Sequence, residues 1–370
     1  MKTINAAIEQ FVRYVVDKDI YIYGLGEVYQ QFTKRDAYGQ ICNSIAGYID
    51  NGKAGQGIMV SGRSYPVYGV EYLRTLDRAV VLLCSTKQLD SMYRALCEQN
   101  LPDSIECFVL PLIWAVSDGE SDSSVISKIC MSGEMPDRID KKIHCFWFSG
   151  EDKPEDYQHC IDSWKRVCPD YEIVEWNAKN YDYRKTPFIE QAFEKRKWAF
   201  VSDYARLDVI YNYGGIYLDM DVELLKRPDA WLKFDAFFNF GTQHDIDLGS
   251  GFGSVKGNPF IGQLLELYSG CDFCDQEGTP MVWKYVQPVY IRDTFRGRGI
   301  RLDGSMQLVD DMLILPRRYH TPVDDFLFEN YVQSEDTVGI HHYNAGWCSE
   351  EFLEQRKVKA FWRKTAEKQL

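Results

Sequence analysis

The sequence lacks several features that would restrict its class at once. No apolar run approaches the roughly 20 consecutive residues that a membrane-spanning helix requires, so no segment that crosses a bilayer is predicted. The sequence also lacks an excess of positive charge, because 42 Lys and Arg stand against 55 Asp and Glu, giving a net charge of −13. Non-specific binding to nucleic acid needs basic residues that neutralise phosphates, so no nucleic-acid partner is expected.

Cysteine is present but does not form a framework. The 11 cysteines are scattered and odd in number, which is typical of reduced thiols in a cytoplasmic protein. Cys271 and Cys274 form one CxxC pair. A structural zinc ion needs four ligands, and neither a second pair nor a nearby histidine is present. We therefore expect a cytoplasmic protein without a structural zinc site.

The 370 residues are sufficient for two domains. Residues 1–137 alternate short apolar segments, such as 19–23 and 79–84, with helical patterns, which predicts a small α/β domain with parallel strands. The order of these elements resembles that of small Rossmann-like domains. The stretch 116–137 is rich in Ser, Asp and Gly and is interpreted as the linker. Residues 138–370 then form the second domain.

A glycine pair in the first domain leaves two interpretations open. Gly24-x-Gly26 follows an apolar segment, and Asp50 lies about where a ribose-binding acid belongs, as in a dinucleotide-binding fingerprint. However, Tyr29 stands at the third glycine position of that fingerprint. A tight turn in a scaffold or docking domain is the alternative.

The most informative stretch is residues 202–223, SDYARLDVIYNYGGIYLDMDVE. Ser202 is expected to cap an amphipathic helix. Gly214-Gly215 then ends the helix, because glycine tolerates backbone conformations that other residues avoid. After the glycines the hydrophobic period changes to two, which predicts one strand over residues 216–222.

Two carboxylates fall on the polar face of this predicted strand. Asp219 and Asp221 alternate with apolar residues that must be buried, so they point into a cleft or towards solvent. Their Cα atoms would lie about 6.5–7 Å apart, a span that suits one divalent ion, Mn²⁺ or Mg²⁺, completed by a polyanionic ligand. Solvated acids at a strand end are the alternative, because a bare Asp-x-Asp is common by chance.

The string of hydrophobic helix, Gly-Gly, aromatic residue and Asp-x-Asp closely resembles the DxD-type glycosyltransferases with a GT-A fold. The nearest group is the family 32-like one, with bacterial capsular-polysaccharide sugar transferases and yeast initiating mannosyltransferases. The resemblance covers roughly residues 137–347. It implies an α/β fold class, in which a GT-A type Rossmann-like nucleotide-sugar-binding domain follows the smaller Rossmann-like domain. It also implies a divalent metal at the donor diphosphate and retention of anomeric configuration.

The resemblance assigns roles to residues around this motif. Asp221 would be the principal metal ligand, and Asp219 would link the metal and the ribose. Asp203 and Arg206, three apart on one helix face, match residues that reach the donor sugar hydroxyls and the diphosphate. Tyr217 matches an aromatic residue that packs against the ribose. Asp203, Arg206, Asp219 and Asp221 are thus the expected catalytic group.

Donor-binding residues are also expected near the two ends of residues 137–347, the region that resembles the family. Trp147, at the end of the predicted strand 142–148, matches a tryptophan that stacks on the nucleotide base; a buried core tryptophan is the alternative. The string VGIHHYNAGW ends at Trp347 and resembles a family string that closes the catalytic domain. It implies that Trp347 contacts the donor. His342 is preferred to His341 as third metal ligand because it precedes an aromatic residue.

The resulting prediction is a metal-dependent, retaining glycosyltransferase. Its donor would be a nucleotide sugar, a UDP-sugar in preference to a GDP-sugar. Its acceptor would be a glycan or a lipid-linked hydroxyl in bacterial surface or capsular polysaccharide synthesis. The basic segment 352–370 either closes the domain or lies on the inner face of the membrane as a peripheral contact.

Two other classes of protein remain open. A phosphohydrolase of the haloacid-dehalogenase type also has an apolar strand followed by DxD, but it has Thr or Val where Glu223 stands. A non-catalytic carbohydrate- or partner-binding protein with a degenerate site is the other. The presence of DxD together with Asp203 and Arg206 argues against it.

Overall fold

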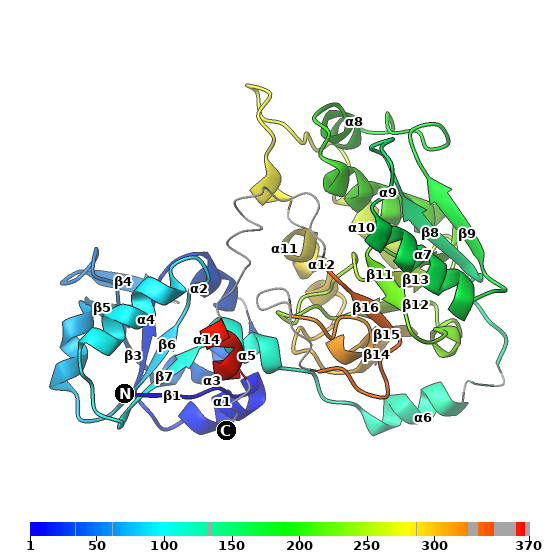
Figure 1. Ribbon diagram of the computed structural model, residues 1–370. Helices are drawn as coiled ribbons and strands as arrows, with labels where there is room; N and C mark the ends of the chain where they lie inside the picture. The colour runs from blue at the N-terminus through cyan, green and yellow to red at the C-terminus, as the bar shows by residue number, and fades with distance from the viewer. Residues whose placement is uncertain are drawn as a thin grey trace. The chain divides into compact units, whose positions relative to one another are not determined.

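The chain forms two compact units (Figure 1). The first contains residues 1–117 and, near the C-terminus, 360–366. The second contains residues 118–323 and 332–343. The computed structural model describes residues 1–33, 35–60, 62–131, 133, 135–285, 287–324, 332–343 and 360–366.

The division lies after Ser117, earlier than the boundary predicted at residue 137. Helix α6 (Ser123–Met131) follows the division and places Val125 in an apolar core of the second unit. Arg318 binds the Asp118 carboxylate at 2.5 Å, which attaches the start of this segment to the same unit. The stretch interpreted as a linker therefore belongs largely to the second unit.

The first unit is built on a seven-stranded sheet in the order β1-β7-β6-β2-β3-β5-β4. All neighbouring strands are parallel except β4 and β5. Tyr21 and Ile22 of β2 lie in different apolar clusters, because successive side chains of a strand point to opposite faces. The strands are β1 (Lys2–Thr3), β2 (Ile20–Tyr23), β3 (Ile45–Ile49), β4 (Gly57–Val60), β5 (Arg63–Tyr68), β6 (Ala79–Leu83) and β7 (Ile105–Val109).

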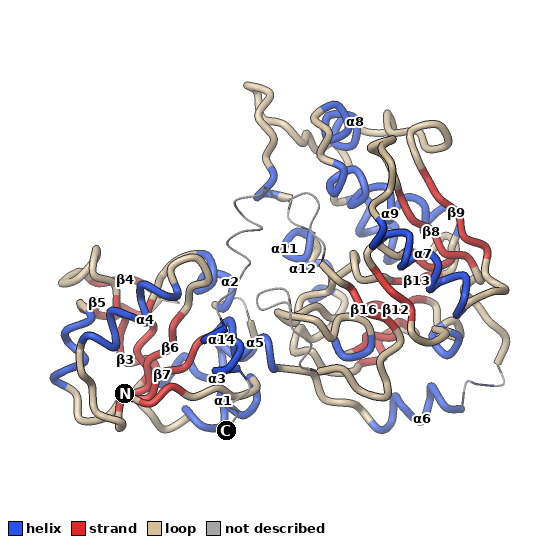
Figure 2. Tube along the Cα trace, viewed as in Figure 1, coloured by secondary structure: helices blue, strands red, loops and turns tan. Residues whose placement is uncertain are grey.

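Helices cover both faces of this sheet (Figure 2). Phe11 of α1 and Trp114 of α5 pack in one apolar cluster, and Met92 of α4 packs in the other. This arrangement is the Rossmann-like α/β architecture predicted for the first unit. The helices are α1 (Ile8–Val15), α2 (Glu27–Phe32), α3 (Asp36–Ile41), α4 (Leu89–Glu98), α5 (Leu110–Val116) and α14 (Ala360–Ala366).

Packing explains the glycine turn between β2 and α2. Gly24 has a φ of 101°, and a Cβ atom there would lie 2.8 Å from Cε of Met92 and 3.1 Å from the carbonyl oxygen of Cys84. Asp50 accepts a hydrogen bond from the backbone N–H of Gly52 at 3.0 Å, as in an ordinary turn. These contacts support the interpretation of a tight strand–helix connection.

The described part of the basic C-terminal segment packs on the first unit. Trp362 of α14 is 2% exposed, its Nε1 donates to the Asp90 carboxylate at 2.7 Å, and its ring meets Tyr93 edge to face. Residues 360–366 therefore belong to the first unit and not to the second domain, which the segment was expected to close, and Trp362 is not free to face a membrane. The rest of the segment 352–370, residues 352–359 and 367–370, lies outside the described residues.

The second unit is built on a mixed seven-stranded sheet in the order β14-β15-β12-β13-β10-β8-β9. The β9-β8-β10 part is parallel, and β13 runs antiparallel to both β10 and β12. The α/β fold class is thereby confirmed for both units. The strands are β8 (Lys142–Phe146), β9 (Glu172–Trp176), β10 (Gly215–Tyr217), β12 (Ala236–Asn239), β13 (Phe252–Ser254), β14 (Gln307–Val309) and β15 (Met312–Leu315).

The helix that precedes Gly-Gly is the most deeply buried one of the second unit. Helix α9 (Trp198–Tyr213) lies against α8, α10 and β8 and is buried on all sides from Phe200 to Ile210, except at Ser202. Burial of charged side chains in such a helix requires partners. The other helices of the unit include α7 (Glu155–Val167), α8 (Pro187–Glu194), α10 (Pro259–Glu266), α11 (Gln287–Tyr290) and α12 (Arg292–Gly297).

Two details of this region differ from the prediction. The helix begins at Trp198, and Ser202 lies inside it, where its hydroxyl donates to the Trp198 carbonyl at 2.9 Å. The predicted single strand is divided into β10 and β11 (Val222–Leu224). Residues 218–221 form a turn in which the backbone N–H of Val222 donates to the Asp219 carbonyl at 3.1 Å.

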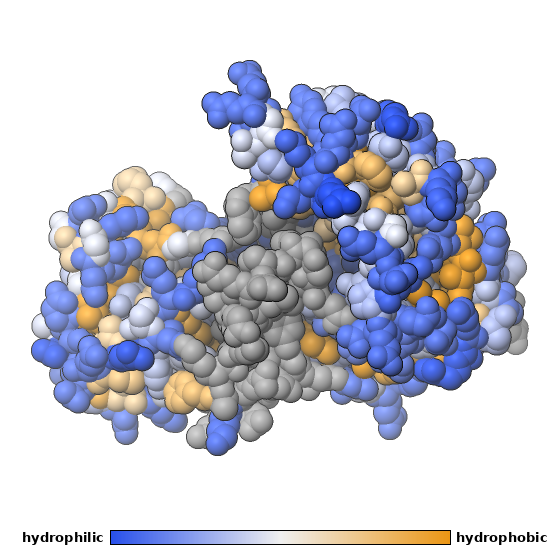
Figure 3. Space-filling view, turned by 45° about the horizontal axis from the view of Figure 1, so that its top comes forward, coloured by the Kyte–Doolittle hydropathy of each residue, from blue (hydrophilic) through white to orange (hydrophobic). Residues whose placement is uncertain are grey.

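The described residues include no helix that is both long and apolar enough to cross a membrane. In the space-filling view the exposed side chains are mainly hydrophilic, and apolar residues occur in small patches (Figure 3). Met59 and Met131 are among the exposed large apolar side chains. Scattered exposure of this kind is normal and needs no partner.

Candidate active site

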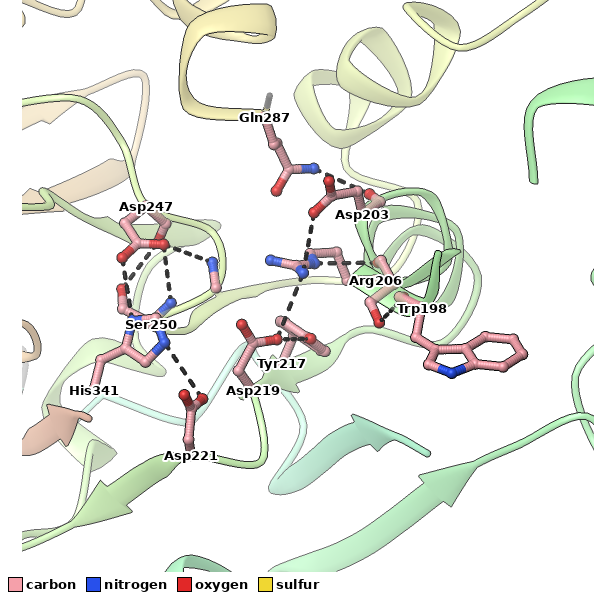
Figure 4. A network of polar contacts seen from close by, with 12 residues as sticks. Trp198, Asp203, Arg206, Tyr217, Asp219, Asp221, Asp247, Ser250, Gln287 and His341 are labelled. Carbon is pink, nitrogen blue, oxygen red and sulfur yellow. Dashed lines mark hydrogen bonds and ion pairs between the residues drawn. The ribbon is translucent and has the colours of Figure 1, made fainter. Parts of the chain in front are cut away.

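The turn between β10 and β11 brings two carboxylates to a histidine from a distant segment. Strand β16 (Gly339–His341) pairs antiparallel with β11, and His341 lies opposite Val222. The ligand atoms of Asp219, Asp221 and His341 all lie within 4.8 Å of one another, and His341 Nε2 is 3.4 Å from Asp221 Oδ1 (Figure 4). The carboxylates predicted to act together therefore do lie together.

His341, not His342, occupies the position expected for the third ligand. Successive side chains point in opposite directions at the end of β16, so the two histidines diverge. His342 Nε2 is 3.2 Å from Glu223 Oε2, and the other oxygen of Glu223 lies 3.6 Å from His159 Nε2. The preference for His342 was based on the aromatic residue that follows it, whereas the strand pairing determines which histidine faces the carboxylates.

Asp247, which the sequence analysis did not predict as a site residue, contacts the ring nitrogen of His341 that does not face Asp221. Its Oδ2 lies 3.3 Å from His341 Nδ1 and accepts from the Tyr343 hydroxyl at 3.1 Å. Burial opposes its ionisation, but His341 and the hydrogen bonds lower the pKa of Asp247 to about 2. Burial likewise disfavours the charged form of His341, yet Asp221 and Asp247 hold the pKa of His341 well above its ordinary value.

The predicted pair Asp203 and Arg206 forms and extends to the DxD turn. Arg206 Nη2 lies 3.1 Å from Asp203 Oδ1 and 3.5 Å from Asp219 Oδ1. Its guanidinium lies 4.7 Å from the centroid of the Tyr217 ring, and the Tyr217 hydroxyl donates to Asp219. Four residues predicted from the resemblance thus make one connected network beside Asp221.

The network continues to Gln287 of α11. Gln287 Nε2 donates to the backbone carbonyl of Asp203 at 3.1 Å and to the Tyr268 hydroxyl at 3.3 Å. Burial raises the pKa of Asp203 to about 7, although Arg206 opposes the shift. Figure 4 shows Arg206 and Asp203 facing Asp247 across a polar space, with Gln287 above it.

Trp147 lies at the same end of the sheet, immediately after β8. It is half-buried, its Nε1 donates to the Glu151 carbonyl at 2.6 Å, and its ring meets Tyr157 edge to face. Burial, together with the charges of Asp221 and Asp219, raises the pKa of Tyr157 to about 12. Tyr157, which contacts Trp147, therefore lies within range of the charges of these two carboxylates. The base-stacking role of Trp147 stays a prediction, and Trp347 lies outside the described residues.

The donor set fits a divalent metal ion. Two carboxylates and one imidazole converge without a cysteine, and hard oxygen ligands with one nitrogen suit Mn²⁺. Mg²⁺ prefers oxygen ligands and usually keeps several waters. Asp219 is the most exposed of the three ligands, since 28% of its side chain is accessible, compared with 12% for Asp221 and 8% for His341. An anionic ligand could therefore approach from the Asp219 side.

Comparison with known proteins places this site in a defined class. Residues 154–238 match the family model described as the glycosyltransferase sugar-binding region containing a DXD motif. Residues 154–238 are therefore similar to the sugar-binding region of the DXD glycosyltransferases. The matched region lies in the second unit and includes Asp203, Arg206, Tyr217 and both carboxylates of the turn. This agrees with the GT-A type expected for that unit.

The curated relatives are fungal mannosyltransferases. Inositol phosphoceramide mannosyltransferase 1 of Schizosaccharomyces pombe is 24% identical over 196 residues, which are 50% of this chain and 58% of that protein. Inositol phosphoceramide mannosyltransferase 3 of the same organism is 30% identical over 139 residues, 34% of this chain and 36% of that protein. Mannosyl phosphorylinositol ceramide synthase SUR1 of Saccharomyces cerevisiae is 30% identical over 143 residues, 35% of each. The chain spans between about a third and somewhat over half of the length of these relatives.

A solved structure described as PaToxG glycosyltransferase is also similar. It is 20% identical, covers 47% of this chain and 77% of its own, and has a TM-score of 0.35.

Proposed function

We propose that this protein is a metal-dependent glycosyltransferase that moves a mannosyl group from a nucleoside-diphosphate sugar to an acceptor hydroxyl. One observation carries the proposal. Asp219, Asp221 and His341 converge beside the Asp203–Arg206 pair, and the match to the DXD sugar-binding region covers all of these residues except His341.

The site residues suit the two ends of such a donor. A divalent ion held by Asp219, Asp221 and His341 would offset the charge that develops on the diphosphate leaving group. Arg206 places a fixed positive charge 3.5 Å from Asp219, which is the most exposed of the three proposed metal ligands. Asp203 can accept hydrogen bonds from sugar hydroxyls. Retention of configuration is part of the proposal, because the family resemblance implies it.

The choice of donor and acceptor follows the relatives. Their names specify mannose and inositol phosphoceramide, so we propose a mannosyl donor such as GDP-mannose in place of the UDP-sugar expected from the sequence. A lipid-borne polyol hydroxyl is the proposed acceptor, and the expected role in capsular polysaccharide synthesis has no support from these relatives. A lipid acceptor would bring the protein to a membrane surface.

A donor screen tests this proposal. The full chain is incubated with GDP-mannose, UDP-glucose or UDP-galactose, in Mn²⁺, in Mg²⁺ or in chelator, and the release of nucleoside diphosphate is measured. We expect release from GDP-mannose that requires the metal. Hydrolysis of a phosphomonoester such as p-nitrophenyl phosphate, without release from any donor, would instead favour the phosphohydrolase. Donor binding without release, even with phosphoinositol acceptors, would favour a binding protein.

A further inference from the structure

Asp247 has no role in the function proposed above, yet it contacts the histidine of the metal-binding group. We propose that Asp247 is the positioning residue of this site. It holds the His341 ring so that Nδ1 faces Asp247 and Nε2 faces Asp221. This inference rests on the proposed metal-dependent function and adds a residue to it.

The Asp247 carboxylate is held at both oxygens. Oδ1 accepts from the backbone N–H groups of Gly249 at 2.9 Å and Ser250 at 3.2 Å. Oδ2 accepts from the Tyr343 hydroxyl at 3.1 Å and lies 3.3 Å from His341 Nδ1. A carboxylate with four partners on two oxygens cannot rotate without losing bonds, so its direction towards His341 is defined by the fold.

Tyr343 fixes the plane of the same histidine. Its ring centroid lies 4.0 Å from that of His341, while its hydroxyl binds Asp247. Tyr343 has a φ of 51°, a left-handed conformation that is uncommon for a bulky side chain and costs free energy. The fold therefore maintains a strained residue at the position where it covers His341 and completes the bonds of Asp247.

The loop of Asp247 also supports a second ligand. The backbone N–H of Asp219 donates to the Gly249 carbonyl at 3.2 Å. A Cβ atom at Gly249 would lie 2.6 Å from Asp219 Oδ2, so glycine allows this close approach. One loop thus positions ligands from two distant segments, Asp219 directly and His341 through Asp247.

The chemistry of histidine ligands gives this arrangement its consequence. A histidine that binds a metal through one nitrogen commonly donates its other N–H to a carboxylate, which fixes the tautomer and makes the ligand more basic. Loss of such a partner typically weakens metal binding about 10- to 100-fold. We therefore expect Asp247 to act on metal affinity. If it contacted the donor sugar instead, its loss would weaken donor binding or turnover and leave the affinity for Mn²⁺ without donor unchanged.

The test measures Mn²⁺ binding to the full chain without donor, by electron paramagnetic resonance of free Mn²⁺. In D247N we expect the dissociation constant to rise about 10- to 100-fold, and in Y343F we expect a smaller rise. The matched control is E223Q, which removes the carboxylate beside the other histidine, His342, and should bind Mn²⁺ as the parent does. Nucleoside-diphosphate binding in chelator should be unchanged in all three variants.

The results distinguish a failure of the positioning role of Asp247 from a failure of the proposed metal-dependent function. If the unmodified chain binds no Mn²⁺, either alone or with nucleoside diphosphate added, the proposed metal-dependent function fails. If it binds and D247N binds equally well, the positioning role is wrong, whether or not turnover falls. If D247N does not fold, as judged by circular dichroism, Y343F decides the question. Unchanged Mn²⁺ affinity in folded Y343F would overturn the proposal.

Discussion

Asp219 and Asp221 lie in the turn between β10 and β11, and His341 reaches them from a strand near the other end of the described chain. Each of these side chains has a partner already. Arg206 stands beside Asp219, and Asp247 stands beside His341. Because the residues form one network, the loss of a single member affects the site as a unit.

Asp221→Asn should lower transfer by at least ~100-fold, because one interaction with developing charge in an active site is typically worth several kcal/mol. Its stability should change little, since the amide has nearly the same shape. Steady-state transfer at limiting and saturating Mn²⁺ measures the effect. A variant with near-parental turnover at limiting Mn²⁺ would contradict the assignment of Asp221 as a metal ligand.

A buried histidine outside the site makes stability depend on pH. His144 Nδ1 accepts from Trp176 Nε1 at 3.1 Å, so the ring is neutral and its Nε2–H donates to the Gly214 carbonyl at 3.0 Å. Burial lowers the pKa of His144 from 6.5 to about 4, although the bond to Gly214 opposes the shift. The unfolded chain therefore binds a proton more readily than the folded chain between these values.

The free energy of unfolding should therefore fall as the pH decreases from about 6.5 to about 4. This one histidine contributes on the order of 3 kcal/mol to the fall. H144Q keeps one donor and one acceptor but does not titrate, so urea unfolding of this variant should show a shallower decline across the same range. An equal decline in both proteins would show that His144 is not responsible.

Single residues also mark the limit of prediction from the sequence. The clustering of Asp203, Arg206, Tyr217, Asp219 and Asp221 could be predicted because they lie close together in a recognisable string, whereas their roles stay predictions. The choice between His341 and His342 could not, since it depends on the register of β16 against β11. Asp247 lies in a Gly- and Ser-rich loop whose composition indicates a turn, and nothing in its spacing connects it to the histidine.

At the scale of elements, the connection from α9 to β10 depends on two glycines with positive φ angles. At Gly215, where φ is 96°, a Cβ atom would lie 2.9 Å from the Lys142 carbonyl oxygen and 3.1 Å from His144 Nε2. Both neighbours belong to β8, which pairs with β10. The close approach of the two strands therefore requires glycine.

G215A should destabilise the fold by more than the ~1 kcal/mol that a left-handed conformation alone costs. Gly257 is a matched control, because its φ is 71° and a Cβ atom there would meet no atom within 4 Å. Thermal or urea unfolding of G215A and G257A separates backbone strain from steric clash. Equal losses of stability in the two variants would contradict the close approach as the cause.

Trp147 follows β8 at the carboxyl end of the parallel strands, where open α/β sheets bind their ligands. If it stacks on the nucleotide base, Trp147→Ala should weaken nucleoside-diphosphate binding by ~1–3 kcal/mol. The loss should be the same with Mn²⁺ and with chelator, because stacking does not involve the metal. Calorimetric titration measures it. Unchanged affinity under both conditions would favour the alternative of a core tryptophan.

The hydrophobic periodicity predicted where helices and strands lie, but it did not predict where a strand is interrupted. The alternation from Ile216 to Val222 correctly separated the side chains of one apolar cluster, which includes Leu218 and Met220, from those of the polar network, although Tyr217 and Asp221 are buried as well. It did not reveal that residues 218–221 form a turn, because a turn that keeps alternating directions has the same pattern as a strand. Similarly, the sequence pattern predicted an amphipathic helix with one exposed face, whereas α9 is buried on all sides.

At the scale of the whole molecule, every proposed donor or metal residue that the structure describes belongs to the second unit. A fragment of residues 118–353 should therefore keep metal-dependent release of nucleoside diphosphate from the donor. The fragment begins at the observed division, since helix α6 contributes Val125 to the core of this unit. A folded, soluble fragment without any release would show that the first unit contributes to the reaction.

The central claim is that His341, together with Asp219 and Asp221, binds a metal that holds the donor diphosphate. The most direct measurement is calorimetric titration of nucleoside diphosphate into the full chain carrying His341→Ala or His342→Ala, each with Mn²⁺ and with chelator. We predict that His341→Ala raises the Mn²⁺ concentration needed for tight binding and leaves metal-free binding nearly unchanged. His342→Ala should behave as the parent under both conditions. The account would be contradicted if His341→Ala kept the parental metal requirement, or if binding weakened equally with and without the metal.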